Sequence, residues 1–488
     1  MLFNSIEFLI FFPVVTTLYF LLAHRFRWML LLGASCYFYM AFVPVYILIL
    51  GGTILIDYFA GIWIEKAEGK RKKVFLVASL ISNIGVLAFF KYYNFLNENL
   101  TVLLHGAGYE NPIPYLSILL PIGLSFHTFQ AMSYTIEVYR GRQQAEKHFG
   151  IYALYVMFYP QLVAGPIERP QNVLPQLHEK KYFNYNDVSS GLKLMAWGLF
   201  KKVVIADRLA LMVNYVYDDP RHFEGLPLII ATIFFAFQIF CDFSGYSDIA
   251  IGSARVMGIK LMTNFDRPYS SRSISEFWSR WHISLSSWFR DYLYIPLGGN
   301  RVSIPRWYFN LVLVFLISGL WHGANWTFIA WGLLHGLYIV ISFMLAPVRK
   351  LFTVKSNLAP YSRKLSVLVT FILVCVAWIF FRAQTLSDAL YILTHSWRHL
   401  DTDMQKIFAD EESRKNLLFL GQNLKTFVIA IASIIFLEAV HKVQSVFPIP
   451  KAFSTRPLIV RWAVYSLFIL TIIQLGIFEE NQFIYFQF

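Results

Sequence analysis

The residue that most clearly suggests chemistry is a histidine in the middle of a long apolar stretch. His322 follows Leu320 and Trp321, and no Lys, Arg, Asp or Glu occurs between Trp307 and Val348. An ionisable side chain is costly at membrane depth, so its presence there indicates a functional site. The alternative is that His322 only joins two helices through a hydrogen bond, a common role of polar residues in membrane bundles.

Three nearby residues could complete a site around His322. If one helix runs through this stretch, Asn325 lies on the same face, and its amide could bind the imidazole or a substrate carbonyl. Trp321 and Trp326 could wall a narrow apolar pocket. His335 would lie about 140° further around an ideal helix, so we expect a structural role for it.

His282 lies in a loop that is rich in aromatic and polar residues. Arg280 and Trp281 precede it, and Ser284 follows it. Arg, Trp and Tyr are typical of the membrane–water boundary. From its position alone, we therefore interpret His282 as an interfacial residue.

Polar residues within other apolar segments have less clear roles. His127 could line a tunnel or pack in the core. Asp242 and Asp248 are six residues apart, which puts them on roughly opposite faces of a helix. They are therefore not a carboxylate pair for acid–base catalysis, and we expect each to bind a basic neighbour.

Several standard catalytic and metal-binding motifs are missing from the sequence. It contains no phosphate-binding loop, no H-E-x-x-H zinc motif and no G-x-S-x-G. No histidine is followed five positions later by Asp, so the H-x-x-x-x-D pattern of soluble acyltransferases is missing too. Cys36, Cys241 and Cys375 form no C-x-x-C pair. ATP-driven pumping and metal-dependent hydrolysis therefore have no support, and no metal site is predicted.

The composition places these residues in a membrane protein. Of the 488 residues, 57% are hydrophobic and 15% are charged, whereas soluble domains have roughly 25% charged residues. The apolar residues occur in runs of about 20, the length of a spanning helix, and lack the period-two alternation of a β-barrel. The net charge of +13 comes mainly from short loops between these runs, which indicates topology and anionic lipid, not nucleic acid.

The predicted fold class is an all-α polytopic membrane protein with about 11 transmembrane helices. Basic loops at 24–27, 65–73 and 139–148 are expected in the cytoplasm, which places the N-terminus outside. No small-residue cleavage site follows the first run, so we expect it to be retained. The expected spans are 6–22, 28–41, 46–64, 74–95, 118–138, 227–243, two within 307–344, 365–381, 417–440 and 458–477.

Three other stretches depart from simple spans. Residues 158–170 are apolar but contain three prolines and a glycine, which predicts a broken or re-entrant segment. Residues 198–208 mix charged and aliphatic side chains, as interfacial helices do. Residues 394–416 are expected to form a polar loop insert outside the membrane. With no sign of a second globular domain, residues 1–488 are predicted to be one membrane-embedded unit.

Six motifs, in order along the whole chain, resemble those of the membrane-bound O-acyltransferase family, and most closely its bacterial alginate O-acetylation branch. One departure is His127, where tyrosine is the common residue. The motifs are LPIGLSFHTFQ from Leu120, QLVAGPI from Gln161, CDFSGYSDIA from Cys241, FWSRWHISL from Phe277, YIPLGGN from Tyr294 and LWHGANW from Leu320.

This resemblance implies an acyltransferase whose helices surround a central funnel or tunnel, with His322 as catalytic histidine and His282 as a second, supporting one. His322 would be the general base that takes a proton from an attacking hydroxyl, which suits a neutral imidazole with a pKa near 6.5. Asn325 or a backbone N–H would stabilise the oxyanion, and His282 would position substrate. The expected substrate-binding or tunnel-lining residues are Asn325, Trp321, Trp326, Arg280, Trp281, Ser284 and His127.

The function implied is O-acetylation of an exported, alginate-like polysaccharide at the bacterial inner membrane. The donor would be acetyl-CoA or an acyl-carrier thioester, with no permanently bound cofactor, and a periplasmic SGNH-type acetyltransferase would complete the transfer. Alternatives are D-alanyl transfer from a carrier protein to teichoic acid, and protein or lipid acylation. A transporter or channel is a different class, but the chain shows no inverted repeat of broken helices.

Overall fold

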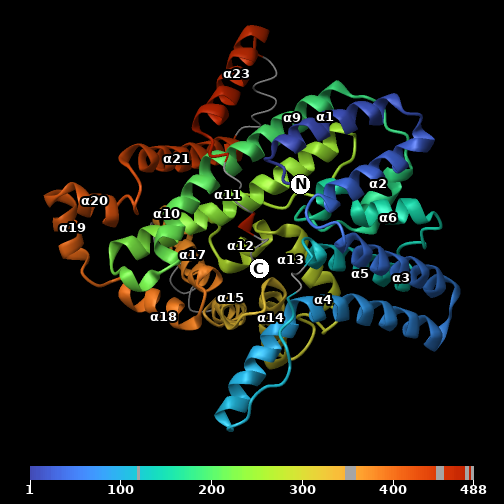
Figure 1. Ribbon diagram of the computed structural model, residues 1–488, viewed down its shortest axis with the longest axis horizontal. Helices are drawn as coiled ribbons and strands as arrows, with labels where there is room; N and C mark the ends of the chain where they lie inside the picture. The colour runs from blue at the N-terminus through green and yellow to red at the C-terminus, as the bar shows by residue number, and fades with distance from the viewer. Residues whose placement is uncertain (118–120, 347–358, 447–455, 479–482, 485–488) are drawn as a thin grey trace.

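The structure is a computed structural model that describes residues 1–117, 121–346, 359–446, 456–478 and 483–484. These residues form helices and contain no β-strand (Figure 1). Eight of the described helices are long and apolar enough to span a membrane. The predicted all-α polytopic architecture is confirmed, and the exact number of spans stays a prediction.

Every predicted span overlaps a helix. The eight long apolar helices are α3 (Tyr46–Lys66), α4 (Gly69–Gly106), α11 (Leu226–Val256), α14 (Ile304–His322), α15 (Trp326–Met344), α17 (Ala359–Arg382), α21 (Leu424–Val446) and α23 (Leu458–Leu475). The three remaining spans correspond to shorter helices, α1 (Ile6–Leu21), α2 (His24–Met40) and α5 (Leu124–Tyr139).

Shorter helices connect and brace these spans. The α-helices among them are α6 (Phe149–Met157), α7 (Tyr159–Leu162), α8 (Pro170–His178), α9 (Tyr185–Leu199), α10 (Asp207–Tyr217), α12 (Ile274–Arg280), α13 (Ile283–Phe289), α18 (Leu386–His395), α19 (Leu400–Ala409) and α20 (Glu411–Leu417). Two π-helices are η1 (Phe200–Ala206) and η4 (Arg290–Tyr294), and two 3₁₀-helices are η2 (Pro220–His222) and η3 (Pro268–Ser270).

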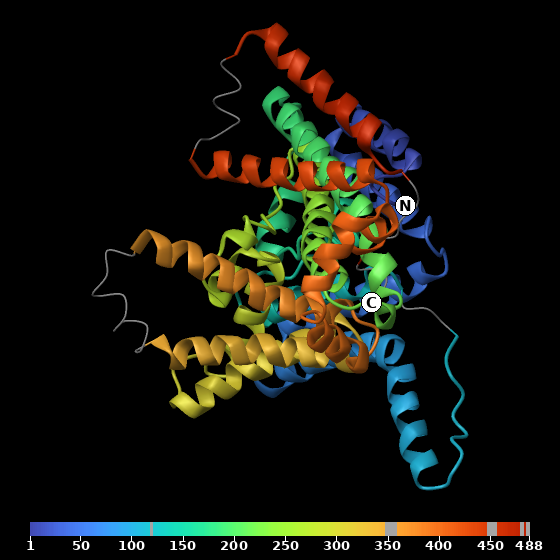
Figure 2. The same cartoon turned by 90° about the vertical axis from the view of Figure 1, so that its left-hand side faces the viewer.

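Two stretches predicted to be loops are helical. The helix α4 does not stop near residue 95 but continues to Gly106, and its far half projects from the bundle (Figure 2). The insert 394–416 contains α19 and most of α20. Both predictions relied on polar composition, which short capped helices share with loops. At α20, for example, the Asp410 side chain accepts a hydrogen bond from the backbone N–H of Ser413.

The helices α9 and α11 pack side by side along much of their lengths (Figure 1). A Cβ atom at Gly198 of α9 would lie 2.5 Å from the carbonyl oxygen of Gly245 in α11, and one at Gly252 would lie 2.6 Å from that of Gly191. Glycine at these four positions lets the two backbones touch, as small residues do in membrane helix pairs. This close packing fixes the part of α11 that borders the site described below.

The segment predicted to be an interfacial helix is instead the buried π-helix η1. Lys202 Nζ lies 2.8 Å from Oδ1 of both Asp207 and Asp242, and Lys201 Nζ lies 2.7 Å from Asp248 Oδ2. The interfacial prediction is wrong because carboxylates inside the bundle, not water, balance these charges. The expectation that Asp242 and Asp248 each bind a basic neighbour is confirmed.

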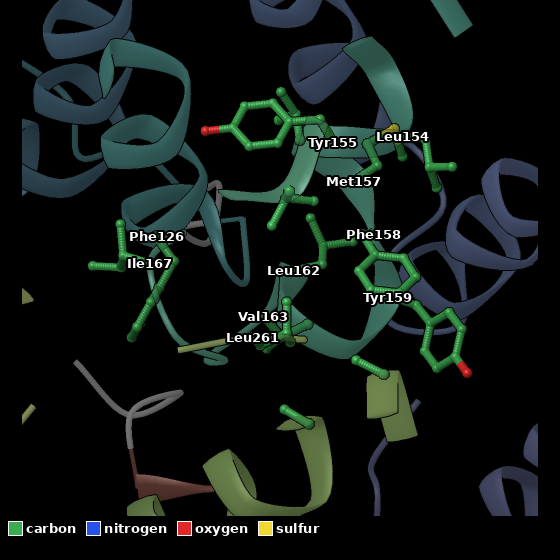
Figure 3. Close-up of a cluster of buried hydrophobic side chains, with 14 of the residues drawn as sticks. Phe126, Leu154, Tyr155, Met157, Phe158, Tyr159, Leu162, Val163, Ile167 and Leu261 are labelled. Atoms are coloured by element: carbon green, nitrogen blue, oxygen red, sulfur yellow. The ribbon is translucent and has the colours of Figure 1, made fainter. Parts of the chain in front are cut away.

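The proline-rich stretch is broken, as predicted, and it packs in the core. The helices α6 and α7 are separated at Phe158, and irregular backbone follows α7 up to α8. Figure 3 shows Leu162 and Ile167 of this stretch gathered with Phe126 of α5 in one apolar cluster. Irregular backbone at membrane depth requires such cover by protein.

The helices α14 and α15 form a tight hairpin. A Cβ atom at Gly319 would lie 2.3 Å from the carbonyl oxygen of Phe328, and one at Gly323 would lie 2.1 Å from the Phe328 ring. Only glycine fits at these two positions without a shift of the neighbouring helix. The hairpin therefore brings the end of α14, with His322, against α15.

Candidate active site

The helix that carries His322 ends at that residue, inside the protein. The last carbonyl groups of a helix have no partner within it, and α4 supplies partners here. Lys91 Nζ donates to the carbonyl oxygens of Trp321 (2.6 Å) and His322 (2.8 Å), and the Tyr92 hydroxyl donates to that of Leu320. The position of His322 is thus fixed through its backbone.

Aromatic rings enclose the His322 imidazole. Its centroid lies 4.8 Å from that of Trp321, 4.9 Å from Trp331 and 5.3 Å from Phe381. The side chain is 5% exposed. In such surroundings, electrostatic interactions of the imidazole with a substrate are stronger than in water.

His282 is fully buried, which corrects its interpretation as an interfacial residue. Its backbone is left-handed (φ 45°, ψ 54°), a conformation uncommon for residues other than glycine. Neither ring nitrogen has a hydrogen-bond partner among the described residues. Burial lowers the pKa of His282 to about 3, so the ring is neutral at pH 7. Strained backbone and an unsatisfied buried ring are both typical of functional sites.

Trp321 lies between the two histidines. Its ring centroid is 4.8 Å from that of His322 and 6.3 Å from that of His282. Phe126 also packs against Trp321 (5.5 Å) and His282 (6.0 Å). The structure therefore brings the two histidines singled out by the resemblance into one aromatic cluster.

Asn325 and Trp326 do not join this cluster. Since the helix ends at His322, Asn325 does not share its helical face, and that prediction is wrong. The Asn325 amide caps α15 by accepting from Thr327 N (3.0 Å) and donates to a backbone carbonyl oxygen (2.9 Å). Trp326 is 51% exposed and donates to Asn99 Oδ1 (3.0 Å), so it does not wall the pocket.

His335 has the packing role expected for it. Its Nδ1 accepts a hydrogen bond from Trp278 Nε1 (3.2 Å), and its ring lies 5.0 Å from that of Trp331. The helical angle behind the expectation does not apply, because α14 and α15 are separate helices. His335 instead supports Trp331, which contacts His322.

Arg280 and Trp281 lie in the shell around the histidines. Arg280 forms an ion pair with Glu276 (2.7 Å), one turn earlier in α12. Trp281 is fully buried, with its ring 5.0 Å from that of Trp378. The ion pair of Arg280 lies within α12, and the contact of Trp281 with α17 helps to fix the backbone next to His282.

Ser284 and His127 hydrogen-bond to other side chains. The Ser284 hydroxyl donates to Asn264 Oδ1 (2.9 Å), which holds the start of α13. The His127 ring shares a hydrogen bond with the Thr53 hydroxyl (3.3 Å), which joins α5 to α3. A role for either residue in substrate binding stays a prediction.

Sequence reasoning missed Lys91, Trp331 and Phe381. Lys91 is the one charged residue between 74 and 95, so the argument from intramembrane charge that singled out His322 applies to it too. The two aromatic residues give no such signal, because rings are common throughout the chain.

A cavity of about 400 Å³ opens beside the segment that carries His282. Its walls are apolar towards α14 and α15 and polar at α12, α13 and η4. The residues that illustrate this are Leu311, Val314, Phe315, Ile339 and Phe343 on the apolar side, and Ser279, Ser286, Ser287 and Arg290 on the polar side.

Comparison with known proteins identifies the class. The model of the membrane-bound O-acyltransferase family matches residues 148–384, which include both histidines. The chain is 38% identical to the peptidoglycan O-acetyltransferase of Helicobacter pylori, over 75% of this chain and 72% of that protein. It is 35% identical to the probable alginate O-acetylase AlgI of Pseudomonas putida over the full length of both. The teichoic acid D-alanyltransferase of Streptococcus thermophilus is 30% identical, over 54% of this chain and 69% of that protein.

The chain therefore belongs to the membrane-bound O-acyltransferase family. It is a multi-pass membrane enzyme that transfers acyl groups to hydroxyls.

Proposed function

We propose that this enzyme moves an acetyl group from a cytoplasmic thioester towards hydroxyls of an exported polysaccharide, with His322 as the general base. The observation that carries the proposal is the placement of His322. It lies at the fixed end of α14, across Trp321 from a second buried histidine. Two relatives are named as an alginate O-acetylase and a peptidoglycan O-acetyltransferase. These names support acetyl as the group that is transferred and a glycan as its acceptor.

The chemistry requires one base and one leaving thiol. His322 takes the proton of the attacking hydroxyl as its oxygen bonds to the thioester carbonyl carbon. The carbon–sulfur bond then breaks, and the departing sulfur receives the proton from the imidazolium. The products are an ester and a free thiol, so no oxidant or metal enters the balance.

His282 is proposed to contact the substrate. Its ring is buried, neutral and unsatisfied by the described residues, so a substrate N–H or O–H group can bind it. The Asn325 amide is engaged at the start of α15, so we assign the oxyanion to backbone N–H groups.

The proposed topology follows the basic loops. With these loops in the cytoplasm and the N-terminus outside, a donor arrives from the cytoplasmic side of the bacterial inner membrane. Residues 1–488 then act as one catalytic unit. A periplasmic SGNH-type acetyltransferase is the proposed partner that delivers the acetyl group to the sugar.

The test uses inside-out membrane vesicles from cells that express the full chain and synthesise a candidate polysaccharide. Vesicles are given acetyl-CoA labelled in the acetyl group, and the label is followed into the glycan as alkali-labile ester. We expect label that depends on this chain. Label absent from every glycan, with the protein present and folded, would contradict the proposal.

D-alanyl transfer is the second candidate, because two teichoic acid D-alanyltransferases also match the chain. The same vesicles, given a carrier protein loaded with labelled D-alanine, separate the two. If label is transferred from the carrier and not from acetyl-CoA, the enzyme transfers D-alanine to teichoic acid and the acetyl proposal is wrong.

A further inference from the structure

A second, open cavity lies next to the end of η4. Its volume is about 480 Å³, and five residues line it: Arg140, Arg142, Asp291, Ile295 and Pro296. Two of the five lining residues are arginines. This suggests an anionic ligand, because arginine is the side chain best suited to bind phosphate.

Further arginines surround this cavity. Arg169 Nη2 lies 3.5 Å from Asp291 Oδ2, and Arg290 Nε lies 2.8 Å from Asp291 Oδ1. Asp291 is therefore neutralised from two sides. Arg142 is exposed at the rim and has no ion pair among the described residues.

The arginines are held in place by Tyr292 and Glu137. The guanidinium carbons of Arg140 and Arg169 lie 5.0 and 4.8 Å from the centre of the Tyr292 ring. Arg140 Nη1 also pairs with Glu137 Oε1 (3.1 Å). The Nη1 atom of Arg169 is buried without a hydrogen-bond partner among the described residues. Four arginines against two carboxylates leave this end of the cavity positively charged.

A purely structural interpretation of Arg140 and Arg142 is that they only offset the partial negative charge at the C-terminal end of α5. Both follow the last residue of α5, where positive charge opposes the helix dipole. That explanation does not require a cavity, the clustering of Arg169 and Arg290 from other segments, or an unsatisfied buried guanidinium nitrogen.

The distance from this cluster to His322 fits a known chemical arm. Successive ring contacts of 5.1, 4.1, 5.1 and 4.8 Å lead from Tyr292 through Trp288, Phe129 and Trp321 to His322. Because the path bends, the sum of these steps is an upper limit for the separation of the Tyr292 and His322 rings, and this limit is close to the length of a fully extended pantetheine arm, roughly 18 Å by standard bond lengths. A phosphate at the arginines can thus belong to the same molecule as a thioester at His322.

We propose that Arg140 and Arg142, supported by Arg169 and Arg290, form the phosphate-binding site for the phosphopantetheine part of the acyl donor. The inference rests on the proposed function and names the group that recognises the donor. The phosphate can come from free CoA or from the phosphodiester of an acyl-carrier protein, which share this chemistry.

The experiment measures thiol release by the full chain in inside-out vesicles with two donors. Acetyl-CoA carries phosphates, and acetyl-pantetheine has the same thioester without them. We expect the wild-type KM to be at least tenfold lower for acetyl-CoA. Arg142→Gln should raise the KM for acetyl-CoA about tenfold, the usual effect of one charge-assisted hydrogen bond. The ratio of the KM for acetyl-pantetheine to the KM for acetyl-CoA should decrease by the same factor.

Arg71→Gln is the matched control, since Arg71 is exposed in another predicted cytoplasmic segment. It should leave the KM for both donors as in the wild type. Asp291→Asn removes the negative charge that lines the cavity and should lower the KM for acetyl-CoA.

An acetylated carrier protein is the third donor, and it identifies the source of the phosphate. Dependence on Arg142 with either phosphorylated donor supports the site. Equal effects of Arg142→Gln on acetyl-CoA, carrier and acetyl-pantetheine, or no effect on any of them, would overturn it.

Equilibrium binding of CoA to the purified chain separates this inference from the proposed function. Weaker CoA binding by the Arg142→Gln variant supports the phosphate site even if no transfer occurs. If the wild type has the same KM for acetyl-CoA and acetyl-pantetheine, the phosphate site is wrong, and the acyltransferase proposal is unaffected.

Discussion

Lys91 Nζ lies 2.8 Å from the carbonyl oxygen of His322, and this hydrogen bond is partly buried. A lysine of α4 thus holds the end of the helix that presents the proposed base. A hydrogen bond contributes roughly 0.5–1.5 kcal/mol, and Lys91 donates two. The loss of this contact should therefore affect the position of His322 before it affects the fold.

Lys91→Met tests that relationship. We expect kcat to fall at least tenfold, since about 1.4 kcal/mol in the barrier is a factor of ten, while the KM for the donor changes little. Initial rates of acyl transfer in vesicles give the answer. Lys73→Met, at an exposed position of the same helix, is the control. Wild-type kcat in a folded Lys91→Met variant would show that the contact has no positioning role.

The α14–α15 hairpin makes a prediction about packing. Gly319→Ala places a methyl group 2.3 Å from the carbonyl oxygen of Phe328, so we expect it to destabilise the protein by about 2 kcal/mol or more. Thermal unfolding in detergent measures this. Gly85→Ala is the matched control, because a Cβ there meets nothing within 4 Å. Equal unfolding temperatures for the two variants would contradict the close approach of the helices.

The spans and His322 could be predicted from sequence because both rest on local patterns. Runs of apolar residues specify spanning helices, and a lone ionisable group in such a run is conspicuous. The run 307–344 is long enough for two spans, which predicts a break near His322, but the pattern does not show on which side of that break Asn325 lies. The surroundings of His282 depend on rings from α5, α11 and α14, and no local pattern in the loop reports such contacts.

The interfacial prediction for the segment that contains η1 is wrong for a related reason. From sequence, Lys201 and Lys202 are indistinguishable from lysines at a membrane surface. Their partners on α11 lie some forty residues away in the chain. The close packing of α9 and η1 against α11 brings these segments together, and its effect on charge pairing is a property of the folded state.

The buried ion group around η1 should contribute strongly to stability. Lys202→Met leaves Asp207 and Asp242 buried without their cation, which costs roughly 3–5 kcal/mol. The triple variant that adds Asp207→Asn and Asp242→Asn should recover much of this loss, because no unpaired charge remains. Thermal unfolding of the three proteins checks the order of stability. A triple variant less stable than Lys202→Met would refute the explanation.

His282 should make stability depend on pH. Its pKa is about 3 in the folded protein and about 6.5 when unfolded. Between these values the unfolded chain binds the extra proton, so stability falls as pH decreases from 6.5 towards 3. At pH 5 the loss from this residue is about 2 kcal/mol.

The variant His282→Asn lacks that contribution. The free energy of unfolding, measured in detergent at pH 7.5 and pH 5, should fall by about 2 kcal/mol less for the variant than for the wild type. Parallel changes in the two proteins would mean that His282 is accessible to protons in the folded state.

The role of His322 is tested most directly by one substitution. His322→Gln keeps a polar side chain but provides no base, and His105→Gln, at an exposed position, is the control. The variant is expected to insert and unfold as the wild type does, yet to transfer labelled acetyl at less than about one-hundredth of its rate, since general-base catalysis contributes roughly 10²–10⁴-fold. Transfer by folded His322→Gln at a rate near that of the wild type would contradict the account.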